Sequence, residues 1–203
     1  MHSDLYNKVA PYYASRIGWY HNLSHINKLL EEAFTRSPNH RISRELYTAI
    51  LFHDIVYDIP LPGTKLDISN EKASAALYKK IYGIGFEQRV VDMIEATEHH
   101  FDHSVYTDHE ICFLLDLDIL GFSNPNMTEF LTVQQHIDKE YIDNGYSTAE
   151  IVEGRLKFMT HIYDTNALQY RVVDNIKGRT KQAYQNIELL MSLYERRVKV
   201  TLN

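Results

Sequence analysis

The segment "LFHDIVYD", residues 51–58, places an imidazole and a carboxylate side by side in an otherwise apolar run. Across residues 43–57 apolar side chains recur every three or four positions, which is typical of a helix that buries one face. Pro60 and Pro62 follow, and proline ends helices because it lacks the backbone N–H. The segment therefore predicts a helix over 43–57, with His53 and Asp54 near its end.

The same spacing recurs along the rest of the chain. It predicts further helices over 23–34, 67–83, 86–101, 108–122, 128–142, 147–163 and about 175–197. Ser24 and Asp67 are expected to cap two of them, and Gly83 and Gly121 to end two. Alternating strand patterns are absent from the sequence. We therefore expect one all-α domain over residues 1–203, with about eight or nine helices.

Composition and charge exclude several classes of protein. Hydrophobic residues make up 44% of the chain and charged residues 24%, as in ordinary globular proteins. The net charge of −6 argues against a general nucleic-acid binder. Cys112 is the only cysteine, so no intrachain disulfide can form, and its apolar neighbours predict a buried thiol. No segment approaches the roughly 20 apolar residues that span a bilayer, so we expect a cytoplasmic protein without a membrane partner. A homo-oligomer is compatible with this composition.

A carboxylate at the position of Asp54 needs a physical reason. In the last turn of a helix it meets the negative end of the helix dipole, which costs roughly 0.3–1 kcal/mol. Burying any carboxylate without a partner among apolar side chains costs more. A cation removes both penalties, and the neutral imidazole of His53 can bind the same ion. The alternative is that His53 hydrogen-bonds a neighbour and Asp54 caps a helix or pairs with an arginine.

Other predicted helices contain further groups that can bind a metal. They are His21 and His25 in "WYHNLSHINKL", His99 and His100 in "EATEHHFDH", and Asp116 and Asp118 in "FLLDLDILG". The first two are four residues apart and therefore share one helix face. The aspartates stand in an apolar run, where burial without a cation is expensive.

The order of these groups resembles the HD superfamily of metal-dependent phosphohydrolases. The likeness is strongest to a branch of predicted HD phosphohydrolases and covers roughly residues 16–163. It is carried by "YHNLSHI" (20–26), "FHDIVYD" (52–58), "NEKASA" (70–75), "ATEHH" (96–100) and "LDLDILG" (115–121). The resemblance implies an HD-type helical bundle with one divalent ion, bound by His25, His53, Asp54 and Asp118. A second ion could bind if His100 contributed.

The resemblance also implies roles around the ion. Glu71 is the expected general base, acting with the metal ligand Asp54. The groups expected to contact the substrate are His21, His100 and Lys72. Those expected to support the ligands from behind are Asp116 and His99, although Asp116 could instead be a rival ligand and His99 a surface residue. Plainer readings exist, since Glu71 can favour the dipole of its own helix and Lys72 can be a solvated surface charge.

A site of two imidazoles and two carboxylates suits Mn²⁺, Fe²⁺, Zn²⁺ or Mg²⁺. With open positions for water and a phosphate oxygen, we expect a metal-dependent phosphohydrolase that cleaves a phosphate ester or anhydride with metal-activated water. The resemblance favours a nucleotide or related small phosphorylated metabolite, on which Tyr20, Tyr57 and Tyr78 could stack. One alternative is a diiron oxygenase, which would need His99 or His100 as a ligand. Another is a silent metal- or nucleotide-binding module, suggested by Asp138, which stands where the branch has arginine.

Overall fold

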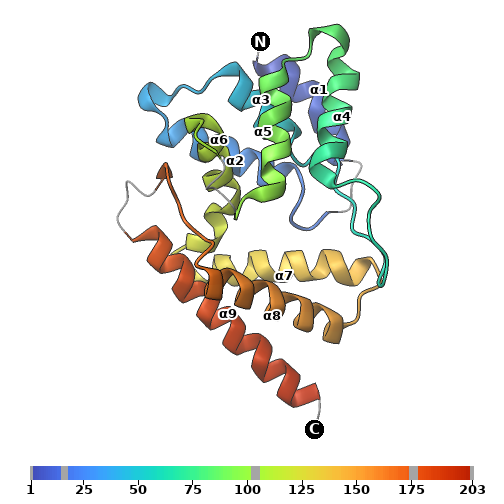
Figure 1. Ribbon diagram of the computed structural model, residues 1–203, viewed down its shortest axis with the longest axis vertical. Helices are drawn as coiled ribbons and strands as arrows, with labels where there is room; N and C mark the ends of the chain where they lie inside the picture. The colour runs from blue at the N-terminus through green and yellow to red at the C-terminus, as the bar shows by residue number, and fades with distance from the viewer. Residues whose placement is uncertain (1, 15–17, 102–105, 174–177, 202–203) are drawn as a thin grey trace.

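The computed structural model describes residues 2–14, 18–101, 106–173 and 178–201, and all regular secondary structure within these ranges is helical. The described α-helices are α1 (His2–Ala14), α2 (Leu23–Arg36), α3 (Arg44–Phe52), α4 (Asn70–Tyr82), α5 (Gln88–Ala96), α6 (His109–Asp118), α7 (Met127–Asp143), α8 (Thr148–Thr165) and α9 (Arg179–Thr201). Figure 1 shows α1–α6 gathered in one group, with α7 and α8 lying beneath it and α9 crossing them. This confirms the predicted all-α fold with about nine helices.

The first helix was not predicted from the sequence. Pro11 lies inside α1, where it removes a backbone donor. Two residues of α1, Val9 and Tyr13, are nevertheless almost fully buried. The Tyr13 hydroxyl donates to the backbone carbonyl of Leu51 at 3.0 Å, which ties α1 to α3.

Two predicted helix caps were wrong by two residues. Asn22, not Ser24, caps α2, and its side chain accepts hydrogen bonds from the N–H groups of Ser24 and His25. Ser69, not Asp67, caps α4 by accepting from the third residue of the helix. In both cases the true cap is the polar residue that immediately precedes the helix, as capping geometry requires.

The helix that leads to His53 is shorter than predicted. α3 ends at Phe52, and His53 donates its backbone N–H to the Ala49 carbonyl as the cap residue. The chain then leaves the helix, because the Ser74 hydroxyl bonds both the N–H and the carbonyl of Val56. Asp54 therefore lies just beyond the helix end, at the start of an irregular segment that runs to the cap of α4.

The predicted ends of two other helices had different outcomes. Gly83 ends α4 as expected, with a φ of 59° that side-chain-bearing residues rarely adopt. Gly121 does not end α6, since α6 stops at Asp118 and a 3₁₀ turn over Ile119–Ser123 contains the glycine. The predicted start of the last helix, residue 175, lies outside the described residues.

The core of the upper group lies around α3. Its last three residues, Ile50, Leu51 and Phe52, are completely buried, and α3 packs on α5, α2 and α1. Burying side chains of this size stabilises the fold by roughly 1.5–3 kcal/mol each. Cys112 is buried, as predicted. Among the described helices, none combines the length and the apolar character that crossing a membrane requires.

Candidate metal centre and adjoining cavity

Side chains from α2, from the end of α3 and from α6 converge on one point. The Nε2 atom of His25 lies 3.2 Å from Asp118 Oδ1 and 3.6 Å from Asp54 Oδ2. The Nε2 atom of His53 lies 3.3 Å from Asp54 Oδ2 and 3.5 Å from Asp118 Oδ1. Ligand atoms of His25, His53 and Asp54 all lie within 4.8 Å of one another, so this group could hold a metal ion. Asp118 lies outside that tightest group but contacts the same two nitrogens.

Three of the four separations in this cluster exceed ordinary hydrogen-bond length, and the fourth, from His25 Nε2 to Asp118 Oδ1 at 3.2 Å, is a long hydrogen bond. Ligand atoms bound at about 2.1 Å to one ion lie roughly 3.0–3.4 Å apart at octahedral or tetrahedral angles. The nitrogen–oxygen distances here run from 3.2 to 3.6 Å. An N–H···O hydrogen bond is usually about 2.7–3.2 Å long. The cluster is therefore spaced as a set of ligands would be.

The tautomer of His53 supports the same reading. Its Nδ1 atom lies 2.9 Å from the Ile50 carbonyl, which can only accept, so Nδ1 carries a hydrogen. Its Nε2 atom is buried and has no hydrogen-bond partner among the described residues. In a neutral ring that nitrogen presents a lone pair to two carboxylates, which is unfavourable unless a proton or a cation lies between them. The residues present thus fit a bound divalent cation.

The pKa values in the cluster show how strongly these groups interact. Burial lowers the pKa of His53, but Asp54 and Asp118 raise it and prevail, so it lies well above the usual value. Burial raises the pKa of both carboxyl groups, but His53 lowers them and prevails. The site therefore keeps both carboxylates ionised and attracts positive charge, whether that charge is a proton or a metal ion.

Of the two predicted histidines in "EHH", the structure brings one to the cluster. The Nδ1 atom of His100 lies 3.4 Å from Asp118 Oδ2, and the ring lines the adjoining cavity. His99 is exposed, so it does not support the ligands from behind as expected. The difference follows from the 3₁₀ turn at Thr97–His99, which points consecutive side chains in different directions.

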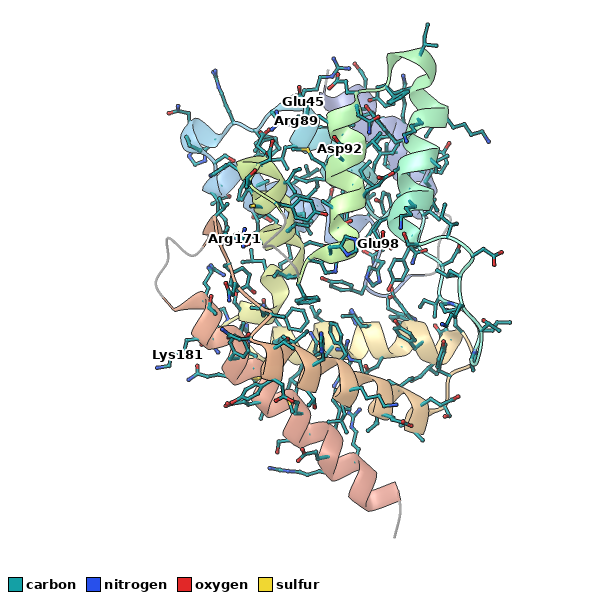
Figure 2. All side chains as sticks on the ribbon, in the orientation of Figure 1. Glu45, Arg89, Asp92, Glu98, Arg171 and Lys181 are labelled. Atoms are coloured by element: carbon teal, nitrogen blue, oxygen red, sulfur yellow. The ribbon has the colours of Figure 1, made fainter. Side chains whose placement is uncertain are left out.

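Asp116 is buried for a different reason from the one predicted. Its carboxylate accepts hydrogen bonds from the backbone N–H groups of Arg171, Val172 and Val173, at 2.6–3.2 Å. Residues two positions apart on a helix point about 200° apart, so Asp116 faces away from Asp118. It fastens the segment after α8, which bears Arg171 in Figure 2, to α6 and does not support the ligands.

Asp116→Ala is therefore expected to destabilise the fold without affecting the metal site. Several backbone donors would lose a charged acceptor, so the free energy of unfolding should fall by about 3 kcal/mol or more. Chemical denaturation measures this, and metal content of the folded protein should stay that of the wild type. The control is Asp92→Ala on the exposed face of α5, which should change stability by less than about 0.5 kcal/mol. Unchanged stability in Asp116→Ala would contradict the assigned role.

His21 is held by a buried glutamate that the sequence did not single out. The Glu140 Oε2 atom lies 2.6 Å from His21 Nδ1, and Oε1 accepts from the backbone N–H groups of Tyr20 and His21. Burial raises the pKa of Glu140, but the hydrogen bond to His21 lowers it and prevails. The His21 ring stacks on Tyr57 with centroids 3.6 Å apart. His21 is thus fixed in orientation, with Nε2 as the ring nitrogen left for a ligand.

A cavity of about 520 Å³ adjoins the cluster and separates it from α7 and α8. Asp54, Asp118 and Glu71 line it on the side of the cluster. Its aromatic lining residues are Tyr20, Tyr57, Phe101, Phe122, Tyr141, Tyr146 and Phe158. Of the tyrosines considered from sequence, Tyr78 instead packs against Phe52 in the core. The cavity is large enough for a small organic ligand.

Lys72 does not reach this cavity. It is exposed on the first turn of α4, and its Nζ atom lies 2.9 Å from Glu98, which Figure 2 labels just after α5. The hydrogen bond to Glu98 raises the pKa of Lys72. The plainer reading of Lys72 as a surface charge is therefore the one the structure supports, and Glu71, its neighbour, is the residue that lines the cavity.

On the far wall lies a polar group that the sequence did not reveal. Arg155 donates to Gln134, and its Nε atom lies 3.4 Å from Asp138 Oδ1. The Tyr194 hydroxyl donates to both Asp138 oxygens, at 2.6 and 2.8 Å, from behind. Arg155 and Gln134 line the cavity, whereas Asp138 does not. Asp138 thus holds an arginine in place, and α9 takes part through Tyr194.

The described residues therefore bring two imidazoles and two carboxylates together at one end of an aromatic cavity. A histidine–glutamate pair and a carboxylate, Glu71, stand beside them. Comparison of the chain with protein-family models, with curated proteins and with solved structures found no match.

Proposed function

We propose that this protein is a metal-dependent phosphohydrolase acting on a small phosphorylated metabolite. The observation that carries the proposal is the convergence of His25, His53, Asp54 and Asp118, with nitrogen–oxygen distances of 3.2–3.6 Å, at the end of a cavity. The ordered likeness of the sequence motifs to the HD superfamily supports the same reaction class. The substrate is a phosphate ester or anhydride.

The proposed ion is Mn²⁺, Fe²⁺, Zn²⁺ or Mg²⁺, and the residues that would hold it are His25, His53, Asp54 and Asp118. When bound, a divalent ion lowers the pKa of a coordinated water and withdraws charge from a phosphoryl oxygen. The hydrogen bond to the Ile50 carbonyl keeps the His53 ring in the tautomer whose Nε2 lone pair is available to the ion. Metal-binding histidines are commonly held by an outer hydrogen bond of this kind.

The chain itself supplies groups for proton transfer and charge stabilisation. Glu71 lines the cavity and is the proposed acceptor for the proton of the attacking water. His21, oriented by Glu140 at 2.6 Å, is the proposed donor to the leaving oxygen. Burial, Asp118 and Asp54 raise the pKa of Tyr20, so its hydroxyl stays protonated and can donate to a phosphoryl oxygen.

His100 supports one other candidate function. Its Nδ1 atom is buried, lies 3.4 Å from Asp118 Oδ2 and has no hydrogen-bond partner among the described residues. A second cation shared by His100 and Asp118 would make the diiron oxygenase a workable alternative. Elemental analysis and oxygen uptake after anaerobic iron loading distinguish the two functions: two irons with oxygen consumption would favour the oxygenase.

Phosphate release from a panel of substrates tests the main proposal. The full chain, loaded with Mn²⁺ or with each other candidate ion, is incubated with nucleotides, pyrophosphates and phosphomonoesters. We expect release from at least one class, dependent on the ion and reversed by chelation. Full metal loading and ligand-induced thermal stabilisation without any release would instead indicate a silent binding module.

Glu71→Gln is expected to keep the ion and lose turnover. The amide cannot accept the proton, so kcat should fall by about 10²–10⁴-fold, while metal content stays unchanged. Glu45→Gln is a matched control, because Glu45 is also a first-turn carboxylate, on α3, but does not line the cavity. Figure 2 labels Glu45 near the top of the molecule. Full activity in Glu71→Gln would remove this residue from the mechanism and leave only its effect on the helix dipole.

A further inference from the structure

The cavity next to the metal cluster carries few positive charges. Its described acidic lining residues are Asp54, Glu71, Asp118 and Glu150. Arg155 is the only lysine or arginine in the part of the lining that the structure describes. Asp138, at 3.4 Å, already offsets the charge of Arg155. Beyond the ion, this cavity thus offers little to balance additional phosphate groups.

Cations do occur nearby, but in a separate cavity. Lys28 and Arg179 line a second hollow of about 530 Å³, which reaches His25 from the other side. The residues that border both cavities are Tyr20, Asp118, Gly121 and Val133. Tyr20 is held there because its backbone N–H donates to Glu140 at 2.6 Å. Neither Lys28 nor Arg179 lines the cavity that contains Glu71 and His21.

The aromatic part of the lining that leads from His100 to α8 is suited to a flat ring. Phe101 meets Phe158 and Phe122 edge to face, with centroids 5.4 and 6.2 Å apart. Phe158 remains 37% exposed although it lines the cavity, so a ligand ring could cover it. Stacked or edge-on aromatic contacts of this kind favour planar ligands over sugars and chains.

One polar side chain of the cavity lining, Gln134, can form a hydrogen bond with a heteroaromatic ring. Arg155 donates to the amide oxygen of Gln134, which fixes the amide orientation. Gln134 is almost fully buried but borders the cavity, and its Nε2 group makes no hydrogen bond to the residues that the structure describes. That group is therefore a donor for an acceptor atom on a heteroaromatic ring.

From the phosphohydrolase function proposed above, and resting on it, we infer that the substrate is a nucleoside monophosphate. Its single phosphoryl group lies at the metal cluster, and its base lies against Phe158 and Gln134. In the reaction a water oxygen bonds to phosphorus while the ester P–O bond breaks. Glu71 takes a proton from the water, and His21 gives one to the leaving oxygen. The products are inorganic phosphate and the nucleoside.

Binding and turnover are measured separately with the Mn²⁺-loaded full chain. The probes are ribonucleoside 5′-monophosphates, the matching triphosphates and ribose 5-phosphate, studied by calorimetry and by phosphate release. At least one monophosphate should bind, and its kcat/KM should exceed that of its triphosphate and of ribose 5-phosphate by at least about a hundredfold. A triphosphate or ribose 5-phosphate that equals the best monophosphate overturns the inference, as does failure of every monophosphate to bind.

Substitutions on the cavity wall formed by α7 and α8 test where the nucleobase binds. Phe158→Ala and Gln134→Leu should each weaken monophosphate binding by about tenfold and leave ribose 5-phosphate unaffected. Phe86→Ala is the matched control, since Phe86 is 38% exposed against 37% for Phe158 but lies outside the cavity. If the monophosphate binds more tightly than the triphosphate and ribose 5-phosphate but no phosphate is released, the ligand class is supported and the phosphohydrolase function is overturned. Phosphate release at the same rate with and without a nucleobase on the substrate would support the phosphohydrolase function and overturn the nucleoside monophosphate as substrate.

Discussion

Asp54→Asn is expected to remove the divalent ion and all metal-dependent phosphate release. Asp54 Oδ2 lies within 3.6 Å of both imidazole nitrogens, so its charge serves both. The amide keeps the shape of the side chain but not the charge, and it presents N–H donors to an ion. We expect metal affinity to fall by at least about a hundredfold, which is the upper range for loss of merely supporting groups. Elemental analysis after gel filtration and the release assay measure both effects, and His53→Ala should behave alike.

The matched control for this prediction is Asp58→Asn. Asp58 lies four residues later in the same irregular segment, is exposed, and uses only its backbone in the hydrogen bonds to Asn70 that are described. It should retain wild-type metal content and activity. Retention of the ion by Asp54→Asn, with the protein folded, would contradict the assigned ligand set.

Glu140→Gln is expected to keep the ion but lower turnover by about 10²–10⁴-fold. A glutamine at this position can donate to His21 Nδ1, so the ring would stay neutral with its hydrogen on Nε2. A neutral imidazole is too weak an acid to give that hydrogen to the leaving oxygen. The loss should depend on the leaving group. A nitrophenolate can leave without being protonated, whereas an alkoxide needs a proton as it leaves. We therefore expect a large loss of kcat with an alkyl phosphate and a small one with p-nitrophenyl phosphate.

Asp143→Asn separates this role from simple loosening of the chain. Asp143 also ties α7 to the segment before α2, by accepting from Trp19 Nε1 at 2.7 Å, but it does not contact His21. A loss in Asp143→Asn that equals the loss in Glu140→Gln would mean that tethering, and not proton transfer, explains the effect. An equal loss of kcat for both leaving groups in Glu140→Gln would also mean that tethering explains the effect.

Much of the fold could be predicted because helical periodicity is strong in this chain. The end of α3 could not, since apolar spacing continues through Val56 and Tyr57 while the Ser74 hydroxyl, eighteen positions on, takes the backbone groups of Val56. The sequence analysis did not predict α1, which contains Pro11 and is tied to α3 by the hydrogen bond from Tyr13 to Leu51. Long-range contacts, which no local pattern contains, decided both cases.

The family resemblance predicted His21, His25, Glu71 and His100 for the site, and a separate criterion was a charge that stands in an apolar run. Asp54 and Asp118 met that criterion, but so did Asp116, whose partners turned out to be the backbone N–H groups of the segment after α8. Glu140 and Arg155 lie on helices with many polar residues, so nothing local distinguished them. Their roles follow from contacts across the fold, such as the pair of Glu140 with His21.

The most direct test of the shared ion is anomalous diffraction from crystals of the Mn²⁺-loaded protein. We predict one strong peak within about 2.0–2.4 Å of His25 Nε2, His53 Nε2 and one oxygen each of Asp54 and Asp118. A peak elsewhere, or these side chains bonded directly to one another with no ion between them, would contradict the account.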